Sequence, residues 1–331
     1  MLVLTKVILA MMIGFMLSIV TGLFLIPILK KMKVKQKISI YLEDSNHKEK
    51  EGTPTMGGLI FIIPTLITSV ILLFMGRIEF SENLLIVMFV FIAHALLGFI
   101  DDYLIIKRKD NAGLTELQKL FGQLLIAVVF FYIYTRSGLD PTINIYTLGI
   151  NINLGWFYGF FILFVLVASS NAVNITDGLD GLAGGLSAIT FIAFGLISLG
   201  ATWVAGYFDI AIFAFILVGS LLGFLFFNSH PAKVFMGDTG SLALGATLAS
   251  IAILTNHEVT LIVVAGVFVL ETLSSLVQII SVKYFNHKIF KMAPLHHHFE
   301  KMGWDERDIV KTFWVFGLLF SMAGILFAVW I

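Results

Sequence analysis

The chain has 331 residues, of which 59% are hydrophobic and only 13% are charged, and its formal net charge is zero. A water-soluble domain carries about a quarter charged residues, so this composition excludes one soluble core and indicates a protein embedded in lipid. The zero net charge gives no support for nucleic-acid binding, and the absence of cysteine excludes disulfides and thiolate chemistry.

Apolar stretches of roughly 17–25 residues, the length that crosses a bilayer as a helix, predict ten membrane spans. They cover residues 3–29, 54–75, 83–100, 118–135, 154–173, 180–200, 203–227, 239–256, 259–282 and 311–331. No linker or low-complexity segment divides the chain, so we expect one all-α polytopic membrane domain over residues 1–331. The first stretch exceeds a signal-peptide core and lacks a small-residue cleavage pattern, so we expect a retained anchor.

The basic residues predict how these spans are oriented. Ten spans put both termini on one side of the bilayer, and the odd-numbered connections on the other. All of the 21 Lys and Arg residues except Lys6, Arg77 and Arg136 then fall in the odd-numbered connections. The positive-inside rule therefore predicts cytoplasmic odd-numbered connections, with both termini extracytoplasmic.

Aspartates gather on the predicted cytoplasmic face. Asp101 and Asp102 close the third predicted span, where mutual repulsion and the helix dipole both disfavour adjacent carboxylates. A solvated helix end would also explain such a pair. Because repulsion and the helix dipole both act against the pair, a bound cation is favoured, and hard carboxylate oxygens suit magnesium.

The connection between the fifth and sixth predicted spans contains Asn171, Asn174, Asp177 and Asp180 at intervals of three residues. Helix capping, with Asp177 before the sixth span and Asp180 at its third position, would explain about one of these residues. It does not explain two asparagines at the end of an apolar span. The spacing therefore indicates a polar site.

Two further segments carry candidate chemistry. Asp238 and Thr239 lie between glycines at the start of the eighth predicted span, where backbone N–H groups attract phosphate, although either residue could serve only as an N-cap. The last predicted cytoplasmic connection contains His296, His297 and His298. Three consecutive histidines cannot all face one point, so we expect a phosphate-binding or acid–base role for one or two of them rather than a zinc triad. The alternative is a solvated loop.

Buried ionisable groups complete the candidates. Glu271 lies inside the ninth predicted span, where a carboxylate is expected to face protein or water rather than lipid. His94 lies inside the third predicted span and is expected to make one core hydrogen bond.

Five segments occur in a characteristic order: TPTMGG (53–58), GFIDDY (98–103), NAVNITDGLDGLAGG (171–185), NSHPAKVFMGDTGSL (228–242) and APLHHHFE (293–300). Together they resemble the phospho-N-acetylmuramoyl-pentapeptide transferase family, within the polyprenyl-phosphate N-acetylhexosamine-1-phosphate transferase superfamily, over nearly the whole chain. The resemblance implies transfer of phospho-MurNAc-pentapeptide from UDP-MurNAc-pentapeptide to undecaprenyl phosphate, with release of UMP. It also implies Mg²⁺ as cofactor and a multi-pass protein of the bacterial inner membrane, with a homodimer as a compatible assembly.

The resemblance also assigns roles by motif position. It implies that the catalytic residues are Asp101, Asp102, Asp238 and His296, with Asp238 as the metal ligand and Asp101 as the base. The substrate-binding positions that it implies are Lys48, Thr53, Asn171, Asn174, Asp177, Asp180, Asn228, Phe235 and His297, with Phe235 stacking on uracil. The family usually has a lysine three residues after the second aspartate, but this chain has Ile105. Cationic support near Asp102 is therefore expected from Lys107 or Lys109.

Phosphoryl transfer depends mainly on positioning and charge neutralisation. A lipid phosphate has a second pKa of about 6 and is largely dianionic at neutral pH, so we expect direct attack, with Asp101 assisting. A covalent aspartyl-phosphate route is the alternative. Two rival functions are a sibling transferase that uses UDP-GlcNAc, and a transporter, whose ionisable groups would lie near the bilayer midplane.

Overall fold

The computed structural model describes residues 3–32, 52–108, 113–139, 141–145, 148–200 and 207–329. Within these ranges, nine helices are long and apolar enough to cross a bilayer. Lys48 and Lys109 lie outside the described residues, so their predicted roles stay predictions.

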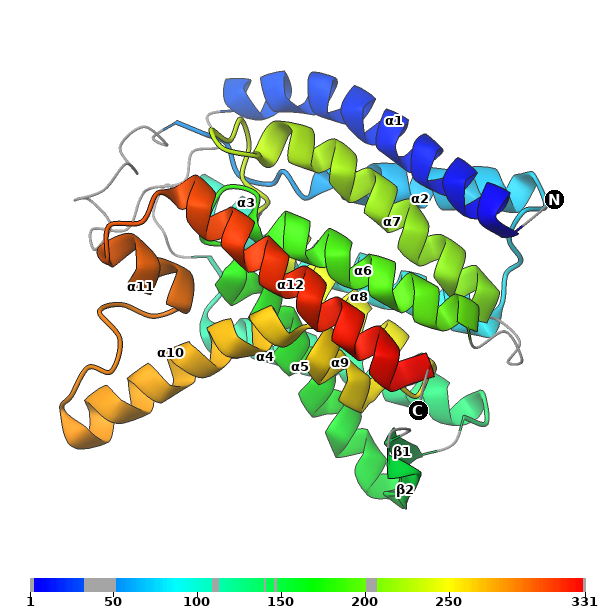
Figure 1. Ribbon diagram of the computed structural model, residues 1–331. Coiled ribbons are helices and arrows are strands. Elements are labelled where there is room, and N and C mark those ends of the chain that lie inside the picture. Colours follow the sequence, from blue (N-terminus) through cyan, green and yellow to red (C-terminus); the bar gives the residue numbers. More distant parts are fainter. Residues whose placement is uncertain are drawn as a thin grey trace.

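The described chain consists of helices and one short hairpin (Figure 1). In chain order the elements are α1 (Val3–Lys31), α2 (Leu59–Phe74), α3 (Glu82–Arg108), α4 (Glu116–Arg136), β1 (Thr142–Ile145), β2 (Ile150–Asn153), the 3-10 helix η4 (Gly155–Phe157), α5 (Tyr158–Thr176), α6 (Leu182–Gly200), α7 (Tyr207–Asn228), α8 (Gly237–Leu254), α9 (Glu258–Val264), α10 (Gly266–Phe285), α11 (Leu295–Lys301) and α12 (Glu306–Val329).

Three helices form the centre of the bundle. α7 and α8 are buried along almost their whole length and α6 along most of it, whereas α1, α4, α10 and α12 expose an apolar face. Large side chains on these faces, such as Phe24, Phe121 and Leu319, are more than half exposed. A helix that is apolar on all sides needs lipid or protein around it, so the outer faces are suited to a bilayer.

Small residues allow α1 and α7 to approach closely. A Cβ atom on Gly219 would lie 2.1 Å from the carbonyl oxygen of Met11. Ser18, on the same face of α1, donates from Oγ to the carbonyl oxygen of Ser220 at 2.8 Å. Such small residues are typical of helix pairs in membranes, where close backbone packing replaces the hydrophobic effect.

The helix ends are arranged so that polar segments meet. Both chain termini lie at the end of the bundle away from α11 (Figure 1). The C-terminal part of α3, the connections that follow α5, α7 and α10, and the start of α8 carry the aspartate and histidine motifs and lie at the other end. Segments far apart in the sequence therefore share one face.

The second and ninth predicted spans differ from the structure. α2 begins at Leu59 and has 16 residues, because the preceding segment packs against the residues before α8. The N–H groups of Gly57 and Gly58 donate to the carbonyl oxygens of Phe235 and Met236 at 2.8 and 2.9 Å. The ninth predicted span is two helices, α9 and α10, which meet at Ala265, and α10 diverges from the bundle (Figure 1).

Two further differences concern the third span and the connection between α4 and α5, which was predicted to be external. α3 continues to Arg108, so the prediction that Asp101 and Asp102 lie at a helix C-terminus is wrong. The hairpin of β1 and β2, paired antiparallel with Thr142 opposite Asn153, was not predicted.

Candidate active site

The side chain of Asp102, on α3, accepts hydrogen bonds from the start of α8. Its Oδ2 accepts the N–H of Thr239 at 2.9 Å and the hydroxyl of Thr239 at 2.5 Å, and its Oδ1 accepts the N–H of Asp238 at 3.3 Å. These N–H groups belong to the first turn of α8 and have no partner within the helix. Asp102 therefore caps α8 from another helix, where the dipole favours a carboxylate.

This cap differs from the predicted one, in which Asp238 or Thr239 would cap its own helix. It requires α3 and α8 to pack backbone against backbone. A Cβ atom on Gly98 would lie 2.1 Å from the carbonyl oxygen of Asp238, so only glycine fits at this position. Residues 98–103 (GFIDDY) and residues 237–241 (GDTGS) thus pack against each other.

Lys119 supplies a cation to Asp101 and Asp238. Its Nζ lies 3.2 Å from Asp101 Oδ2 and 2.8 Å from Asp238 Oδ2. The other oxygen of Asp101 accepts the N–H of Leu114 at 2.6 Å. Asp101 is 1% exposed, so Lys119 compensates a charge that water hardly reaches.

Sequence reasoning missed Lys119, which lies in the first turn of α4. That helix starts with a capping box, in which Thr115 Oγ1 accepts the N–H of Gln118 and Gln118 Oε1 accepts the N–H of Thr115. A lysine in a first helical turn opposes the dipole, and this unfavourable position was the available signal. The expected alternatives were Lys107 and Lys109, of which Lys109 lies outside the described residues.

Asp238 is more accessible than Asp101 and Asp102. It is 21% exposed, and its Oδ1 accepts Asn174 Nδ2 at 2.8 Å while Lys119 holds Oδ2. Asn174 also donates to Ser241 Oγ at 2.9 Å. Asn174 therefore holds the Asp238 carboxylate beside Ser241 at the start of α8.

Asp177 brings a fourth carboxylate. It follows α5 as the C-cap residue, and it accepts the N–H of Gly237. The prediction that it caps the sixth span is wrong, because α6 starts only at Leu182. Burial, and then the charges of Asp238, Asp102 and Asp180, raise the pKa of Asp177 well above its ordinary value.

Asp101 and Asp238 thus contact the Lys119 ammonium group, and Asp102 and Asp177 accept backbone N–H groups at the start of α8. We call these four aspartates, with Lys119, the carboxylate cluster. Ionised, it carries more negative than positive charge, and the raised pKa of Asp177 reflects that excess. Hard oxygen donors with excess negative charge suit a small divalent cation, so the residues fit Mg²⁺.

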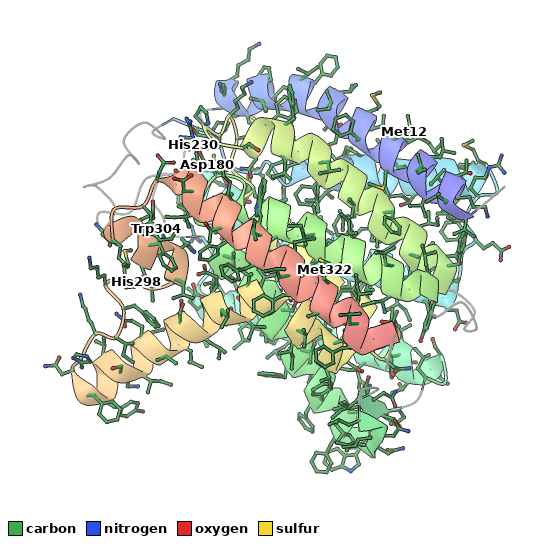
Figure 2. The ribbon with its side chains drawn as sticks, in the orientation of Figure 1. Met12, Asp180, His230, His298, Trp304 and Met322 are labelled. Carbon is green, nitrogen blue, oxygen red and sulfur yellow. The ribbon has the colours of Figure 1, made fainter. Side chains whose placement is uncertain are left out.

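Asp180 has a different environment. Its Oδ2 accepts the N–H of Ala232 at 3.0 Å and lies 3.1 Å from His230 Nδ1, and its own N–H donates to Glu306 Oε1 at 2.7 Å. Asp180 and His230 lie beside each other near the start of α12 (Figure 2). Possible ligand atoms of Asp180, His230 and Glu306 lie within 4.8 Å of one another, and hydrogen bonds already account for this grouping.

Asn228 forms hydrogen bonds with both the α5–α6 connection and the α7–α8 connection. Its Oδ1 accepts the N–H of Gly181 at 3.1 Å and its Nδ2 donates to the carbonyl oxygen of Val234 at 2.9 Å. The side chain is 3% exposed. Its predicted contact with the substrate would therefore need a substrate that enters between these loops.

The three histidines have three different partners. His296 is fully buried, with Nδ1 3.0 Å from Glu271 Oε2. His297 Nδ1 lies 2.6 Å from Glu300 Oε2, and His298 Nδ1 accepts the N–H of Lys291 at 3.1 Å. The expectation that they do not converge is confirmed, and the solvated-loop alternative is wrong for His296.

The remaining predicted residues lie around the cluster. Asn171 is one turn before Asn174 on α5 and donates to buried Gln123 Oε1 at 3.1 Å. Thr53 and Phe235 are half-buried, and the segments that carry them pair through the N–H of Phe235 and the carbonyl oxygen of Pro54. The substrate contacts of all these residues stay predictions. His94 makes its expected core bond, with Nδ1 3.1 Å from the carbonyl oxygen of Val90.

A membrane-embedded helical bundle with this cluster at one end matches a known class. Residues 84–256, just over half of the chain, match the family model described as "Glycosyl transferase family 4". Residues 50–62 match a second model, "Phospho-N-acetylmuramoyl-pentapeptide-transferase signature 1".

Curated relatives carry the same printed name, "Phospho-N-acetylmuramoyl-pentapeptide-transferase". A protein of Geobacillus sp. (strain WCH70) is 47% identical over 98% of each chain. Proteins of Halalkalibacterium halodurans and Bacillus subtilis (strain 168) are also 47% identical, over 98% and 96% of each chain. The chain belongs to the phospho-N-acetylmuramoyl-pentapeptide-transferase family. It is a transferase and a multi-pass protein of the bacterial inner membrane, so the transporter alternative is wrong.

Proposed function

We propose that this chain transfers phospho-MurNAc-pentapeptide from UDP-MurNAc-pentapeptide to undecaprenyl phosphate. The products are undecaprenyl-diphospho-MurNAc-pentapeptide and UMP, in the first membrane step of peptidoglycan synthesis. The observation that carries the proposal is the carboxylate cluster, which gathers four carboxylates and Lys119 at one end of a lipid-facing bundle. The relatives' printed name supports the choice of substrate.

The reaction forms one phosphoanhydride bond and breaks another. An oxygen of the lipid phosphate attacks the phosphorus that bears the sugar, and the bond to the UMP oxygen breaks. The attacking phosphate is largely dianionic at neutral pH, so no strong base is required. Lys119 and the α8 N-terminus would counter the charge that accumulates near Asp238.

Mg²⁺ is the cofactor that we propose for this cluster. Asp238 is better exposed than Asp101 and Asp102 and would be a ligand, and Asp101 and Asp177 could also contribute oxygen atoms. When bound, Mg²⁺ would neutralise the diphosphate and orient it. Asp102 is the least suited as a ligand, because both of its oxygens cap α8.

We also propose ten spans, in which α2 with its preceding segment counts as the second. Both termini would be extracytoplasmic and the carboxylate cluster cytoplasmic, as the positive-inside rule predicts. The chain has no cysteine, so single cysteines can test this topology. An impermeant maleimide outside sealed spheroplasts should label L148C in the hairpin connection and leave D308C at the start of α12 unlabelled. The reverse pattern would contradict the orientation.

The purified chain in detergent tests the activity. With undecaprenyl phosphate and Mg²⁺, we expect UMP release from UDP-MurNAc-pentapeptide, little from UDP-GlcNAc, and none with EDTA. Faster release from UDP-GlcNAc would favour the sibling transferase and overturn the proposal. Trapping a labelled phospho-enzyme would overturn direct attack alone. Homodimerisation stays a prediction, and light scattering of the purified protein checks it.

A further inference from the structure

Glu271 and His296 form a fully buried pair whose role the carboxylate cluster does not explain. Glu271 Oε2 lies 3.0 Å from His296 Nδ1, and Glu271 Oε1 accepts the N–H of His296 at 3.2 Å. Both side chains are 0% exposed. One carboxylate on α10 therefore holds both the first turn of α11 and the imidazole ring that α11 carries.

This arrangement fixes which atom of His296 is available for chemistry. Glu271 occupies Nδ1 whichever of the two groups carries the shared proton, so only Nε2 is left for another partner. The remaining nitrogen, Nε2, is buried and has no hydrogen-bond partner within the described part of the chain. A buried polar atom without a partner is uncommon and often marks a functional contact.

Nε2 faces the loop that carries two of the predicted substrate residues. A Cβ atom on Gly178 would lie 2.3 Å from His296 Nε2, so only glycine leaves room for the ring. Gly178 follows Asp177, which accepts the N–H of Gly237 beside Asp238. The imidazole ring of His296 therefore packs against the loop that also carries Asp177 of the carboxylate cluster.

We propose that Glu271 is a positioning residue that acts through His296. It holds the ring with Nε2 directed at the Asp177–Asp180 loop, where this nitrogen can form a hydrogen bond with the nucleotide donor. The proposal rests on the proposed function, because it needs the nucleotide donor to bind at that loop. For histidines that bind metal ions, loss of the carboxylate that orients the ring costs about 10- to 100-fold, and we expect an effect of similar size here.

The alternative is that Glu271 only anchors α11. A double-mutant cycle distinguishes this anchoring role from the positioning role. The variants are E271Q, H296Q and the double substitution, with kcat and KM measured from UMP release. We expect H296Q to lower kcat by about 100-fold and E271Q by about 10-fold or more, with KM for the nucleotide donor changed less than kcat. In the H296Q background, E271Q should have no further effect, since the carboxylate acts only through the ring.

Gln278 provides a matched control on the same helix. Its Oε1 accepts the N–H groups of Ile289 and Phe290, so it anchors the segment before α11 without touching His296. Q278L should therefore keep kcat within about twofold, even if the protein unfolds at a lower temperature. If Q278L lowers kcat as much as E271Q does, anchoring explains both effects and the proposal is wrong.

Two outcomes overturn the inference while leaving the proposed function intact. One is a wild-type kcat in E271Q, and the other is multiplicative losses from E271Q and H296Q. Should E271Q fail to fold, E271D takes its place in the same cycle, because it keeps the charge but withdraws it by one methylene group. A wild-type chain that releases no UMP would instead overturn the proposed function.

Discussion

Replacing Lys119 with methionine tests the electrostatics of the carboxylate cluster. The change keeps most of the side-chain length and removes the ammonium that lies 3.2 Å from Asp101 and 2.8 Å from Asp238. Asp101 is only 1% exposed, so water cannot replace the lost cation. The folded protein would then hold like charges close together without compensation.

The expected magnitude follows from burial. Lys119 is 19% exposed, which places this pair among buried rather than surface ion pairs. Removing one partner of a buried pair costs about 3–5 kcal/mol, in line with about 4 kcal/mol for unit charges 4 Å apart at an effective dielectric constant near 20. At about 2 °C per kcal/mol for a large chain, the melting temperature of K119M should fall by about 6 °C or more in EDTA.

Tryptophan fluorescence during heating in detergent measures this change. K119R should stay near the wild type, and Mg²⁺ should recover part of the loss in K119M, because it supplies charge to the same carboxylates. K311M is the matched control: Lys311 and Asp308 are 71% and 67% exposed at 3.4 Å, and such pairs contribute about 0–1 kcal/mol. A K119M protein in EDTA that melts no lower than K311M would refute the reasoning.

Two further changes have defined outcomes. Because the pKa of Asp177 is raised by burial and by Asp238, Asp102 and Asp180, its ionisation costs stability as pH rises above the ordinary value of 3.8. D177N should therefore melt at a higher temperature than the wild type at pH 8, and this difference should vanish near pH 4. A difference in melting temperature that is the same at both pH values would contradict the raised pKa of Asp177. G178A places a methyl group 2.3 Å from His296 Nε2, so UMP release should fall by about 100-fold, and unchanged release would show that the ring can move without loss.

The sequence predicted the spans well because lipid leaves few alternatives for an apolar stretch of about 20 residues. It also predicted that Asp101, Asp177 and Asp238 would share one face, since helices that alternate in direction bring alternate connections together. α2 was predicted too long because Pro54 to Gly58 are apolar enough for a span. In the structure the N–H groups of Gly57 and Gly58 donate to the segment before α8, and the carbonyl oxygen of Pro54 accepts from it. Composition does not reveal such pairing.

The details of the site depend on contacts between helices. Asp102 caps α8 only because Gly98 lets α3 approach, and Lys119 reaches Asp101 only because α4 starts beside the end of α3. Glu271 was rightly expected to face protein, but its partner His296 is 25 residues away. The β1–β2 hairpin had a local signal that was overlooked, the alternation of Ile and Asn in residues 150–153.

Binding of Mn²⁺ as a stand-in for Mg²⁺, followed by electron paramagnetic resonance, tests the metal site most directly. In the presence of the nucleotide donor, the wild type and D308N should bind Mn²⁺ with equal affinity, whereas D238N should bind it about tenfold more weakly or worse. Asp308 is an exposed aspartate on α12 and so controls for loss of one surface charge. Equal Mn²⁺ affinity in D238N and the wild type would show that the divalent ion, if one binds, is held elsewhere.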